Sequence, residues 1–418
     1  MIWRSPLRSK RFTAQLGLVL LIGLPVLLIT GLLSYAAYNP DLGGGNDRTP
    51  DKGVLGFFLF DWPTNPAGLY QVTQGTHVIL GIALIPVLLA KLWSVIPALF
   101  AWPPVRSLGH AIERSSLVML VGGGVFVFAT GVLNIQQWYV FPVGFYRAHF
   151  YGAWIFVAGL VIHLVVHFGS MVSALRNRLA AEPAGRRPAG RTHDERPDGD
   201  QPRPSQGTVS RRGALASVTA SSALLVLLTV GQSTGGWLRE LALLAPRGRG
   251  EQFPVNRTAE QAAVPTELTG TDWRLELHGA STVQLRRSEL LAMPQHTERI
   301  TLACVEGWST TRIWSGVRLR DLAELAGVPE PTDVLIRSLQ QRGSFASAHL
   351  RGNQILDPRS LLALRVDDEE LSLDHGFPAR IIVPNNPGVH NTKWVASMSF
   401  TAIDDAARPE PGRNGDGA

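Results

Sequence analysis

The sequence contains one cysteine, Cys304, within the run TLACVEGWST at residues 301–310. A lone buried cysteine is most often a small apolar filler. A catalytic thiolate needs a histidine partner, and no local Cys-His-Asn pattern accompanies Cys304. One cysteine cannot build a zinc or iron–sulfur site alone, but a single thiolate can complete the shell of a metal that an organic cofactor already holds. The residue type therefore leaves two readings open, an apolar filler and a metal ligand.

Histidines recur within apolar segments, where an ionisable side chain is costly and indicates a function. His149 and His163 are 14 residues apart, which is about 21 Å along a helix and close to four whole turns. They point from nearly the same face, so each could bind the iron of a separate haem. His77 lies at a similar depth in another segment and is the best partner for His163. A b-type haem takes two axial imidazoles; the alternative is a hydrogen bond between helices.

Two motifs, in the right order, resemble those of the sulfite oxidase superfamily. ACVEGWS followed by IWSGVRLRDLAELAG is similar to the molybdenum-ligand segment, and DHGFPARIIVPNNPGVHNTKWV is similar to the pterin-binding segment. The resemblance covers residues 255–402 and is closest to the periplasmic protein-methionine-sulfoxide reductase catalytic subunits, whose ligand run reads Cys-Val-Glu-Ala-Trp-Ser. It implies a molybdopterin cofactor and an oxidoreductase activity.

The resemblance implies one metal ligand and a set of cofactor contacts. Cys304 would be the protein thiolate on molybdenum, beside the sulfurs of the pterin. His375 and Arg380 match a His/Asn-x4-Arg pair that holds the pterin. The other implied cofactor contacts are the phosphate-binding turn of Asn391, Thr392 and Lys393, Ser338 where the reductase branch has a threonine, and the upstream pair Asn256 and Arg257. Arginine and lysine suit a buried phosphate because they make charge-assisted hydrogen bonds.

The run after the cysteine departs from the sulfite-oxidising branch of the superfamily. That branch has a Gly-Asn-Arg-Arg-type run that helps to bind the anion, whereas Val305, Glu306, Gly307 and Trp308 stand here. The difference weakens the expectation of a small oxyanion substrate. Arg312 does resemble a position of the sulfite branch and could still face an anion.

Five apolar segments are expected to span a membrane, because a span needs about 20 mainly apolar residues. They are Phe12–Ala36, Thr76–Ala98, Leu117–Leu133, Trp154–Val172 and Ala214–Val230. Basic residues lie before the first segment, between the second and third, and after the fourth, so the positive-inside rule places the N-terminus in the cytoplasm. With its histidines, the stretch 12–178 resembles the four-helix di-haem cytochrome b family that anchors bacterial respiratory oxidoreductases.

The sequence between the apolar segments and the C-terminal part changes in composition. Residues 179–212, rich in Pro, Gly, Arg and Asp, are predicted to be a disordered cytoplasmic linker. The pair Arg211–Arg212 before the fifth span, 213–234, resembles a twin-arginine export signal; the alternative is the ordinary basic flank of a span. The fifth span would stay as an anchor and carry the oxidoreductase domain, 250–405, outside, with a disordered tail at 406–418.

The C-terminal part has the pattern of a mixed α+β domain. WRLELHG, RITLAC, DVLIRSL, ARIIVP and VASMSF are predicted to be strands. SGVRLRDLAELAGV and DPRSLLALRV are predicted to be short helices. The predicted fold is therefore multi-domain, with an N-terminal all-α four-helix transmembrane bundle at 1–178, a fifth anchoring helix, and a C-terminal α+β domain of the sulfite oxidase type.

Composition narrows the class of protein. Only 17% of the residues are charged, which favours an integral membrane part joined to a water-exposed one. The net charge of +6 comes from basic residues that cluster beside apolar segments, so membrane lipid, and not nucleic acid, is the expected partner. A single cysteine excludes an internal disulfide.

These observations predict a membrane-bound molybdopterin oxidoreductase of the bacterial cytoplasmic membrane, with its C-terminal domain extracytoplasmic. Electrons would pass from quinol through one or two b-type haems to the molybdenum site, which would reduce a small-molecule or protein sulfoxide. The rival enzyme is a sulfite dehydrogenase that donates electrons to quinone. A third hypothesis, from another class, is a haem-containing membrane sensor without molybdenum.

Overall fold

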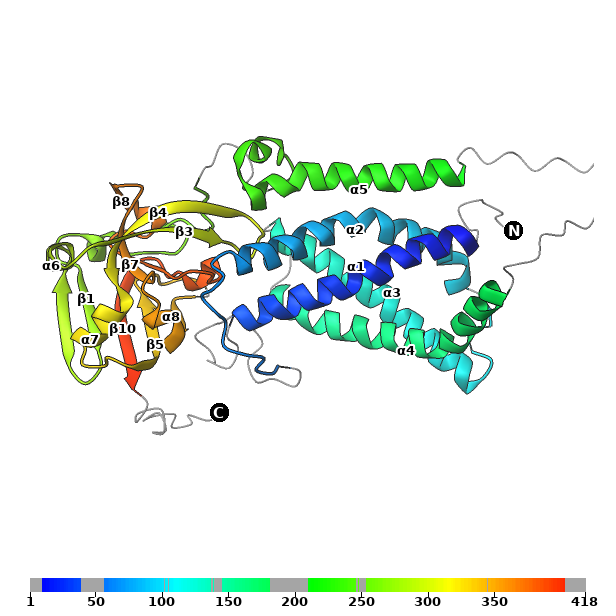
Figure 1. Cartoon of the computed structure of the whole chain (residues 1–418), viewed down its shortest axis with the longest axis horizontal. Helices are drawn as coiled ribbons and strands as arrows, with labels where there is room; N and C mark the ends of the chain where they lie inside the picture. The colour runs from blue at the N-terminus through cyan, green and yellow to red at the C-terminus, as the bar shows by residue number, and fades with distance from the viewer. Residues whose placement is uncertain are drawn as a thin grey trace, which may run out of the picture. The chain divides into compact units, whose positions relative to one another are not determined.

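The computed structural model describes residues 10–38, 56–100, 102–103, 105–136, 138, 145–180, 210–245, 247, 253–343 and 345–402 (Figure 1). Within these ranges, the side chains of residues 10, 97–98 and 167–180 are not described. Most of the predicted linker at 179–212 and the whole predicted tail at 406–418 lie outside the described residues, so both stay predictions.

Five helices of the described chain are long and apolar enough to cross a membrane by length and composition. They are α1 (Lys10–Ala37), α2 (Leu69–Leu99), α3 (Leu108–Ile135), α4 (Phe145–Ala180) and α5 (Arg211–Thr234). Each contains one of the predicted apolar segments and extends beyond it at both ends. The prediction of an N-terminal region of apolar helices is therefore confirmed.

The chain divides into two compact units, each of which takes parts of these helices. The first unit comprises Met1–Leu21, Ile85–Ala129 and His149–Ser222. Its helices approach closely at glycines: a Cβ built on Gly159 would lie 2.7 Å from the backbone nitrogen of Leu120, and one on Gly123 would lie 3.1 Å from the Cα of Phe156. Such contacts are how small residues let apolar helices pack in lipid.

The second unit comprises Ile22–Leu84, Thr130–Ala148 and Ala223–Ala418, and it contains the α+β domain. The strands of this domain are β1 (Arg274–His278), β2 (Thr282–Arg286), β3 (His296–Ala303), β4 (Ser309–Arg318), β5 (Pro331–Ser338), β6 (Ser347–Arg351), β7 (Leu361–Val366), β8 (Glu369–Glu370), β9 (Arg380–Ile382) and β10 (Val395–Ala402). Its α-helices are α6 (Arg287–Ala292), α7 (Leu319–Leu325) and α8 (Gly352–Leu356), and its 3₁₀ turns are Gly236–Leu241, Thr266–Thr269, Leu373–His375 and Gly388–His390.

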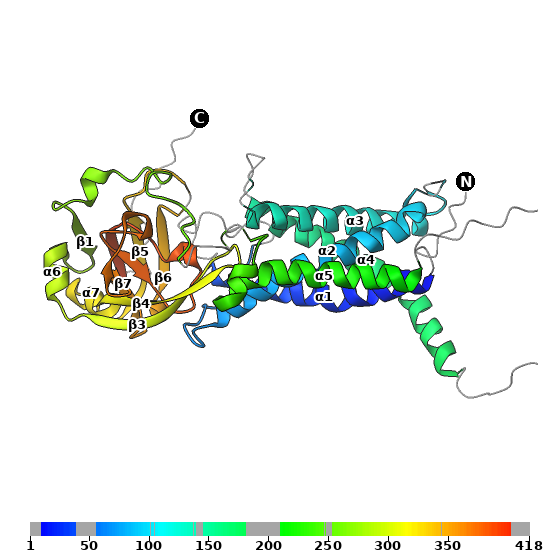
Figure 2. The ribbon, with the colours of Figure 1, turned by 90° about the horizontal axis from the view of Figure 1, so that it is seen from above.

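The strands form two sheets (Figure 2). One has the order β2-β1-β10-β5-β6, and the other has the order β3-β4-β7-β8, with β9 also paired to β7. The pair β1–β10 is parallel, whereas the other described pairs are antiparallel. The main core joins both sheets, because Leu277 of β1, Ile336 of β5 and Leu364 of β7 belong to one buried cluster.

The five strands predicted from sequence are confirmed, each overlapping one of β1, β3, β5, β9 and β10. The helix predicted in SGVRLRDLAELAGV is confirmed only for Leu319–Leu325, because Ser315–Arg318 still belongs to β4. The helix predicted in DPRSLLALRV is wrong: Leu361–Val366 forms β7, between β4 and β9. An apolar run of this length is compatible with a short helix and with a buried strand. Here the hydrogen bonds to β4 and β9 make the segment a strand.

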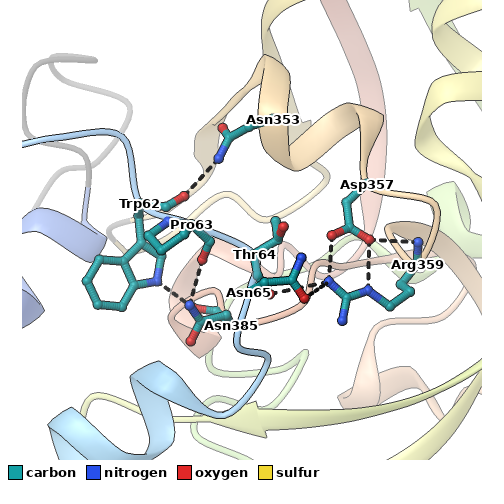
Figure 3. A network of polar contacts seen from close by, with 8 residues as sticks. All are labelled: Trp62, Pro63, Thr64, Asn65, Asn353, Asp357, Arg359 and Asn385. Carbon is teal, nitrogen blue, oxygen red and sulfur yellow. Dashed lines mark hydrogen bonds and ion pairs between the residues drawn. The ribbon is translucent and has the colours of Figure 1, made fainter.

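The loop between α1 and α2 packs on the α+β domain through one network of polar contacts (Figure 3). The Trp62 indole N–H donates to the Asn385 carbonyl at 2.7 Å, and the Asn385 amide donates to the Pro63 carbonyl at 2.6 Å. The Arg359 guanidinium donates to the Asn65 side-chain oxygen at 2.9 Å. Trp62 is fully buried in this contact. The loop therefore supports the turn at Asn385, which leads into the predicted phosphate-binding segment.

Candidate functional site

Cys304 lies in the tight turn between β3 and β4. Its backbone N–H donates to the Trp308 carbonyl at 2.8 Å, and the Gly307 N–H donates back to its carbonyl at 3.0 Å. Gly307 has a φ of +90°, a conformation that glycine adopts without a steric penalty. The Asn256 amide donates to the Cys304 sulfur at 2.8 Å. The turn thus fixes the direction of the sulfur atom.

The environment of the sulfur distinguishes between the two interpretations of Cys304, an apolar filler and a metal ligand. The side chain is buried, and burial raises the pKa of the Cys304 thiol above its ordinary value, with the Glu306 carboxylate adding to the rise. A thiol of this kind is a poor nucleophile, whereas a metal ion would favour its thiolate. No group of three His, Cys, Asp or Glu in the described residues could hold a metal ion. Cys304 therefore suits a metal that a cofactor brings with it.

A cavity of about 670 Å³ opens beside Cys304. Its wall includes Asn256, Glu306 and Trp308 from the surroundings of the sulfur, and His375 and Lys393 from the later motif. The other predicted cofactor contacts that line it are Arg257, Arg380, Asn391 and Thr392. One cavity therefore brings together the cysteine motif and the later pterin motif, which are about seventy residues apart in the sequence.

Buried cations gather along the wall formed by the later motif. Burial, followed by the Arg380 charge, lowers the pKa of Lys393 to about 7, and burial lowers the pKa of Arg380 to about 10. The Lys393 ammonium donates to the backbone carbonyls of Arg257 and Asp374. Cations whose pKa values fall in this way would be stabilised by an anion, and phosphate is the anion that lysine and arginine bind best.

His375 is held as a flat wall of the cavity. Its ring stacks on Phe253 with centroids 3.8 Å apart, and its Nε2 lies 3.2 Å from the Phe253 carbonyl. Its Nδ1 lies 2.8 Å from the Ser372 hydroxyl. Burial is the main cause that lowers the pKa of His375, so the ring is neutral near pH 7. A neutral, fixed ring fits a contact to a pterin better than a contact to its phosphate.

Asn391 and Ser338, two other predicted cofactor contacts, make hydrogen bonds that support the backbone around the cavity. The Asn391 side-chain oxygen accepts from the Val383 N–H at 2.9 Å, so the residue braces the turn from inside. Ser338 does not line the cavity; its hydroxyl donates to the Lys393 carbonyl at 2.8 Å. The structure therefore places Ser338 where it positions the backbone of Lys393.

Several polar atoms in the cavity wall indicate that a ligand belongs there. Four buried atoms have no hydrogen-bond partner among the described residues: Oδ1 of Asn256, Nε of Arg257, Nε of Arg380 and Oγ1 of Thr392. A buried polar group without a partner costs free energy, so such groups are rare unless a ligand or water completes them. The donors and acceptors in the wall fit a polar cofactor that carries a phosphate.

Three residues that line the cavity were not predicted from sequence: Glu306, Arg247 and Asn134. The Glu306 carboxylate lies 3.8 Å from the Arg247 guanidinium and accepts from the Trp308 indole N–H at 3.1 Å. Asn134, at the end of α3, also lines the cavity. Arg247 lies in a PRGRG run without a recognisable motif, and Asn134 lies in an apolar segment. Only the folded structure therefore shows that both line the cavity. By contrast, Arg312 pairs with Asp367 at 3.0 Å and does not line the cavity.

The three predicted haem ligands lie on two of the apolar helices. His77 belongs to α2 within the second unit, where its Nδ1 lies 3.1 Å from both the Leu27 carbonyl and the Thr30 hydroxyl. Such a contact fixes the tautomer whose Nε2 carries the lone pair, as in many metal-binding histidines. His149 and His163 belong to α4 within the first unit. The proposed pairing of His77 with His163 therefore stays a prediction.

Comparisons with known proteins agree with the cysteine and pterin motifs. Residues 261–408 match the family described as the oxidoreductase molybdopterin binding domain. An uncharacterized oxidoreductase, YuiH, of Bacillus subtilis is 32% identical over 152 residues, which cover 36% of this chain and 74% of that protein. The mitochondrial sulfite oxidase of Drosophila melanogaster is 31% identical over 219 residues, or 42% of this chain and 38% of that protein.

Another relative is named for sulfoxide chemistry. The putative protein-methionine-sulfoxide reductase subunit YedZ1 of Azospira oryzae is 27% identical over 189 residues, which cover 44% of this chain and 71% of that protein. The B. subtilis match is both above 30% identity and long relative to that protein, and the family match covers both motifs of the cavity. The chain belongs to the sulfite oxidase family of molybdopterin-binding oxidoreductases.

Proposed function

We propose that this oxidoreductase is a membrane-bound enzyme that uses electrons from quinol to reduce a neutral sulfoxide. Electrons would pass through b-type haem on the apolar helices to the site at Cys304, on the extracytoplasmic side. Quinol oxidation to quinone releases two electrons and two protons. Reduction of a sulfoxide to a thioether and water consumes the same number of each, so the two half-reactions balance.

The observation that carries this proposal is one cavity that is lined both by a buried thiol and by buried cations. Cys304 would hold the molybdenum, and the Asn256 amide would orient its sulfur. Lys393, Arg380 and Arg257 would hold the pterin phosphate. When bound, the molybdenum–pterin group would supply the two-electron oxygen-atom transfer, while the protein supplies ligation, orientation and charge.

The charges of the wall favour a neutral substrate. With Lys393 protonated, as an anion beside it would favour, the cavity is lined by four cations and two carboxylates, a net charge of +2: Arg247, Arg257, Arg380, Lys393, Glu306 and Asp374. A phosphate monoester carries about −1.5 to −2 near pH 7, so the bound cofactor would balance this excess. Arg247, the cation nearest the Cys304 turn, already has Glu306 as partner. Little positive charge is left for an oxyanion such as sulfite.

The haem part of the proposal rests on the three histidines of the apolar helices. His77 and His163 would share one iron, and His149 would bind a second haem. The orientation of His77 by Leu27 and Thr30 supports its role as a ligand, because axial histidines need their other ring nitrogen fixed. The basic flanks of the spans support a cytoplasmic N-terminus and an extracytoplasmic catalytic domain. Arg211 and Arg212, at the start of α5, would serve as a twin-arginine export signal.

A second function, sulfite oxidation with quinone as acceptor, is favoured by the similarity to the Drosophila sulfite oxidase. The sensor hypothesis is not favoured, since the chain belongs to a family of oxidoreductases.

One preparation of the full chain in detergent tests the proposal. Molybdenum, pterin and haem are measured first, and then turnover with a quinol analogue and methionine sulfoxide is compared with turnover of sulfite and a quinone analogue. The proposal expects molybdenum, pterin and haem together, and sulfoxide reduction faster than sulfite oxidation. Preferred sulfite oxidation would support the second function, and absence of haem would remove the quinol route.

A further inference from the structure

The turn that carries Cys304 is held from outside its own domain by two apolar helices of the second unit. The Gln74 side-chain amide on α2 donates to the Val305 carbonyl at 2.6 Å. The Ser233 hydroxyl on α5 donates to the Gly307 carbonyl. Val305 and Gly307 lie within the turn that begins at Cys304, so the two helices contact the backbone of the turn itself.

The shape of the turn is matched to α2. A Cβ built on Gly307 would lie 3.0 Å from the side-chain atoms of Val78, so α2 packs directly on this glycine. Nearby, the Gln71 amide donates to the Ser309 hydroxyl at 2.8 Å and to the Ser233 carbonyl at 3.0 Å. The contact therefore combines close packing with hydrogen bonds from the amide groups of Gln71 and Gln74.

The same stretch of α2 carries a predicted haem ligand. His77 follows Gln74 by three residues, and residues three apart lie on the same side of a helix. Gln74 is buried, and its amide makes the hydrogen bond nearest to Cys304 among the described contacts from α2. A short bonded path therefore runs from His77 through one helical turn to Gln74, across one hydrogen bond to Val305, and on to Cys304.

We propose that Gln74 is a positioning residue that couples α2 to the Cys304 turn, so that electrons enter the molybdenum site through the Gln74–Val305 hydrogen bond. This inference rests on the proposed function, in which quinol supplies the two electrons and a sulfoxide consumes them. Electronic coupling falls more steeply across a van der Waals gap than across a hydrogen bond. Loss of the amide donor should therefore slow electron transfer without changing the site where the sulfoxide reacts.

The test compares Gln74→Met with a matched control, Gln71→Met, in the full chain in detergent. Gln71 lies one turn earlier on α2 and makes contacts of the same kind with Ser309 and Ser233. Haem and molybdenum contents are measured first. The haem is then reduced, methionine sulfoxide is added, and the rate of haem re-oxidation is followed by stopped-flow absorbance. A viologen dye, which delivers electrons without α2, gives sulfoxide turnover as a second readout.

The expected result is a fall of about tenfold or more in haem re-oxidation for Gln74→Met, equal to about 1.4 kcal/mol of added barrier. Viologen-driven turnover, haem spectrum and molybdenum content should stay at the values of the unmodified chain, and Gln71→Met should re-oxidise its haem at the unmodified rate. Gln74→Leu, which has a similar size and no donor, should repeat the Gln74→Met result.

Each other result overturns the inference in a recognisable way. Unchanged re-oxidation in Gln74→Met removes the route but leaves the proposed function standing. An equal fall in Gln71→Met, or in viologen-driven turnover, shows that the helix only docks the domain. Failure of both Gln74 variants to retain haem and molybdenum gives Gln74 a structural role alone. An unmodified chain without haem overturns the proposed function together with the inference.

Discussion

Two sets of charged side chains line the cavity and differ in how they are balanced: Lys393 and Arg380 are buried cations with lowered pKa values, whereas Arg247 is paired with the Glu306 carboxylate beside Cys304. Lys393 and Arg380 have their pKa values lowered to about 7 and about 10 by burial. Arg247 lies 3.8 Å from Glu306. Among the described residues, Lys393 and Arg380 thus lack a balancing anion, whereas the pair of Arg247 and Glu306 is nearly neutral by itself.

In the proposed function this difference corresponds to two tasks. Lys393 and Arg380 would bind the cofactor by charge, and the hydrogen bonds around Cys304 would fix its sulfur for a metal. Changes to the two sets of residues should therefore fail in different ways, one in cofactor content and the other in turnover.

The largest effect is expected for Cys304→Ser. Loss of the ligand sulfur should lower sulfoxide turnover by about a hundredfold or more, as expected when an essential interaction in the reacting centre is removed. The haem spectrum should be unchanged, because the apolar helices are untouched. Turnover above about a tenth of the unmodified rate would contradict the role of Cys304 as a metal ligand.

Lys393→Ala should act on cofactor content. Removing a charge-assisted contact to phosphate costs about 1.5–3 kcal/mol, so pterin affinity should fall by about tenfold or more. Molybdenum and pterin assays on the purified chain measure this change. The control is Arg365→Ala, an exposed arginine on β7, which should keep full loading; equal loading of both variants would show that Lys393 does not hold the phosphate.

Glu306→Gln should remove the charge balance of Arg247 while keeping an acceptor for the Trp308 indole N–H. Arg247 then lacks its carboxylate, and inhibition of sulfoxide reduction by sulfate should strengthen about fivefold, equal to about 1 kcal/mol. Glu369→Gln, an exposed change on β8, is the control and should leave inhibition unchanged. If sulfate inhibits both variants equally, the charge-balance argument for a neutral substrate is wrong.

A separate effect, independent of turnover, is a pH dependence of stability in the cofactor-free protein. Lys393 has a folded-state pKa of about 7 against an ordinary 10.5, so between these values the unfolded state binds a proton that the folded state lacks. Stability should therefore rise with pH across this window and be flat below it. Melting temperatures of cofactor-free chain and of Lys393→Met, measured from pH 6 to pH 10, check this; an equal rise in both would assign the effect to other groups.

Local sequence patterns were enough to predict the parts of the site that lie within one segment. Cys304 and the Lys393 turn each belong to a short motif, and the structure brings both to one cavity. Arg247, Asn134 and Gln74 reach this region only through contacts between segments far apart in the chain, which no local pattern encodes. The strand at Leu361–Val366 was mistaken for a helix for a similar reason, since its local sequence does not reveal that it pairs with β4 and β9.

Ser233 of α5 and Gly307 are in contact and lie 74 residues apart in one chain. This affects how electron delivery should depend on protein concentration. Because one polypeptide carries both surfaces, docking is intramolecular, with an effective concentration of about the millimolar range for short flexible connections. A contact too weak to hold two separate proteins together would then remain closed. Electron delivery should accordingly be insensitive to dilution of the protein in the membrane, unlike delivery between separate subunits that must first meet by diffusion.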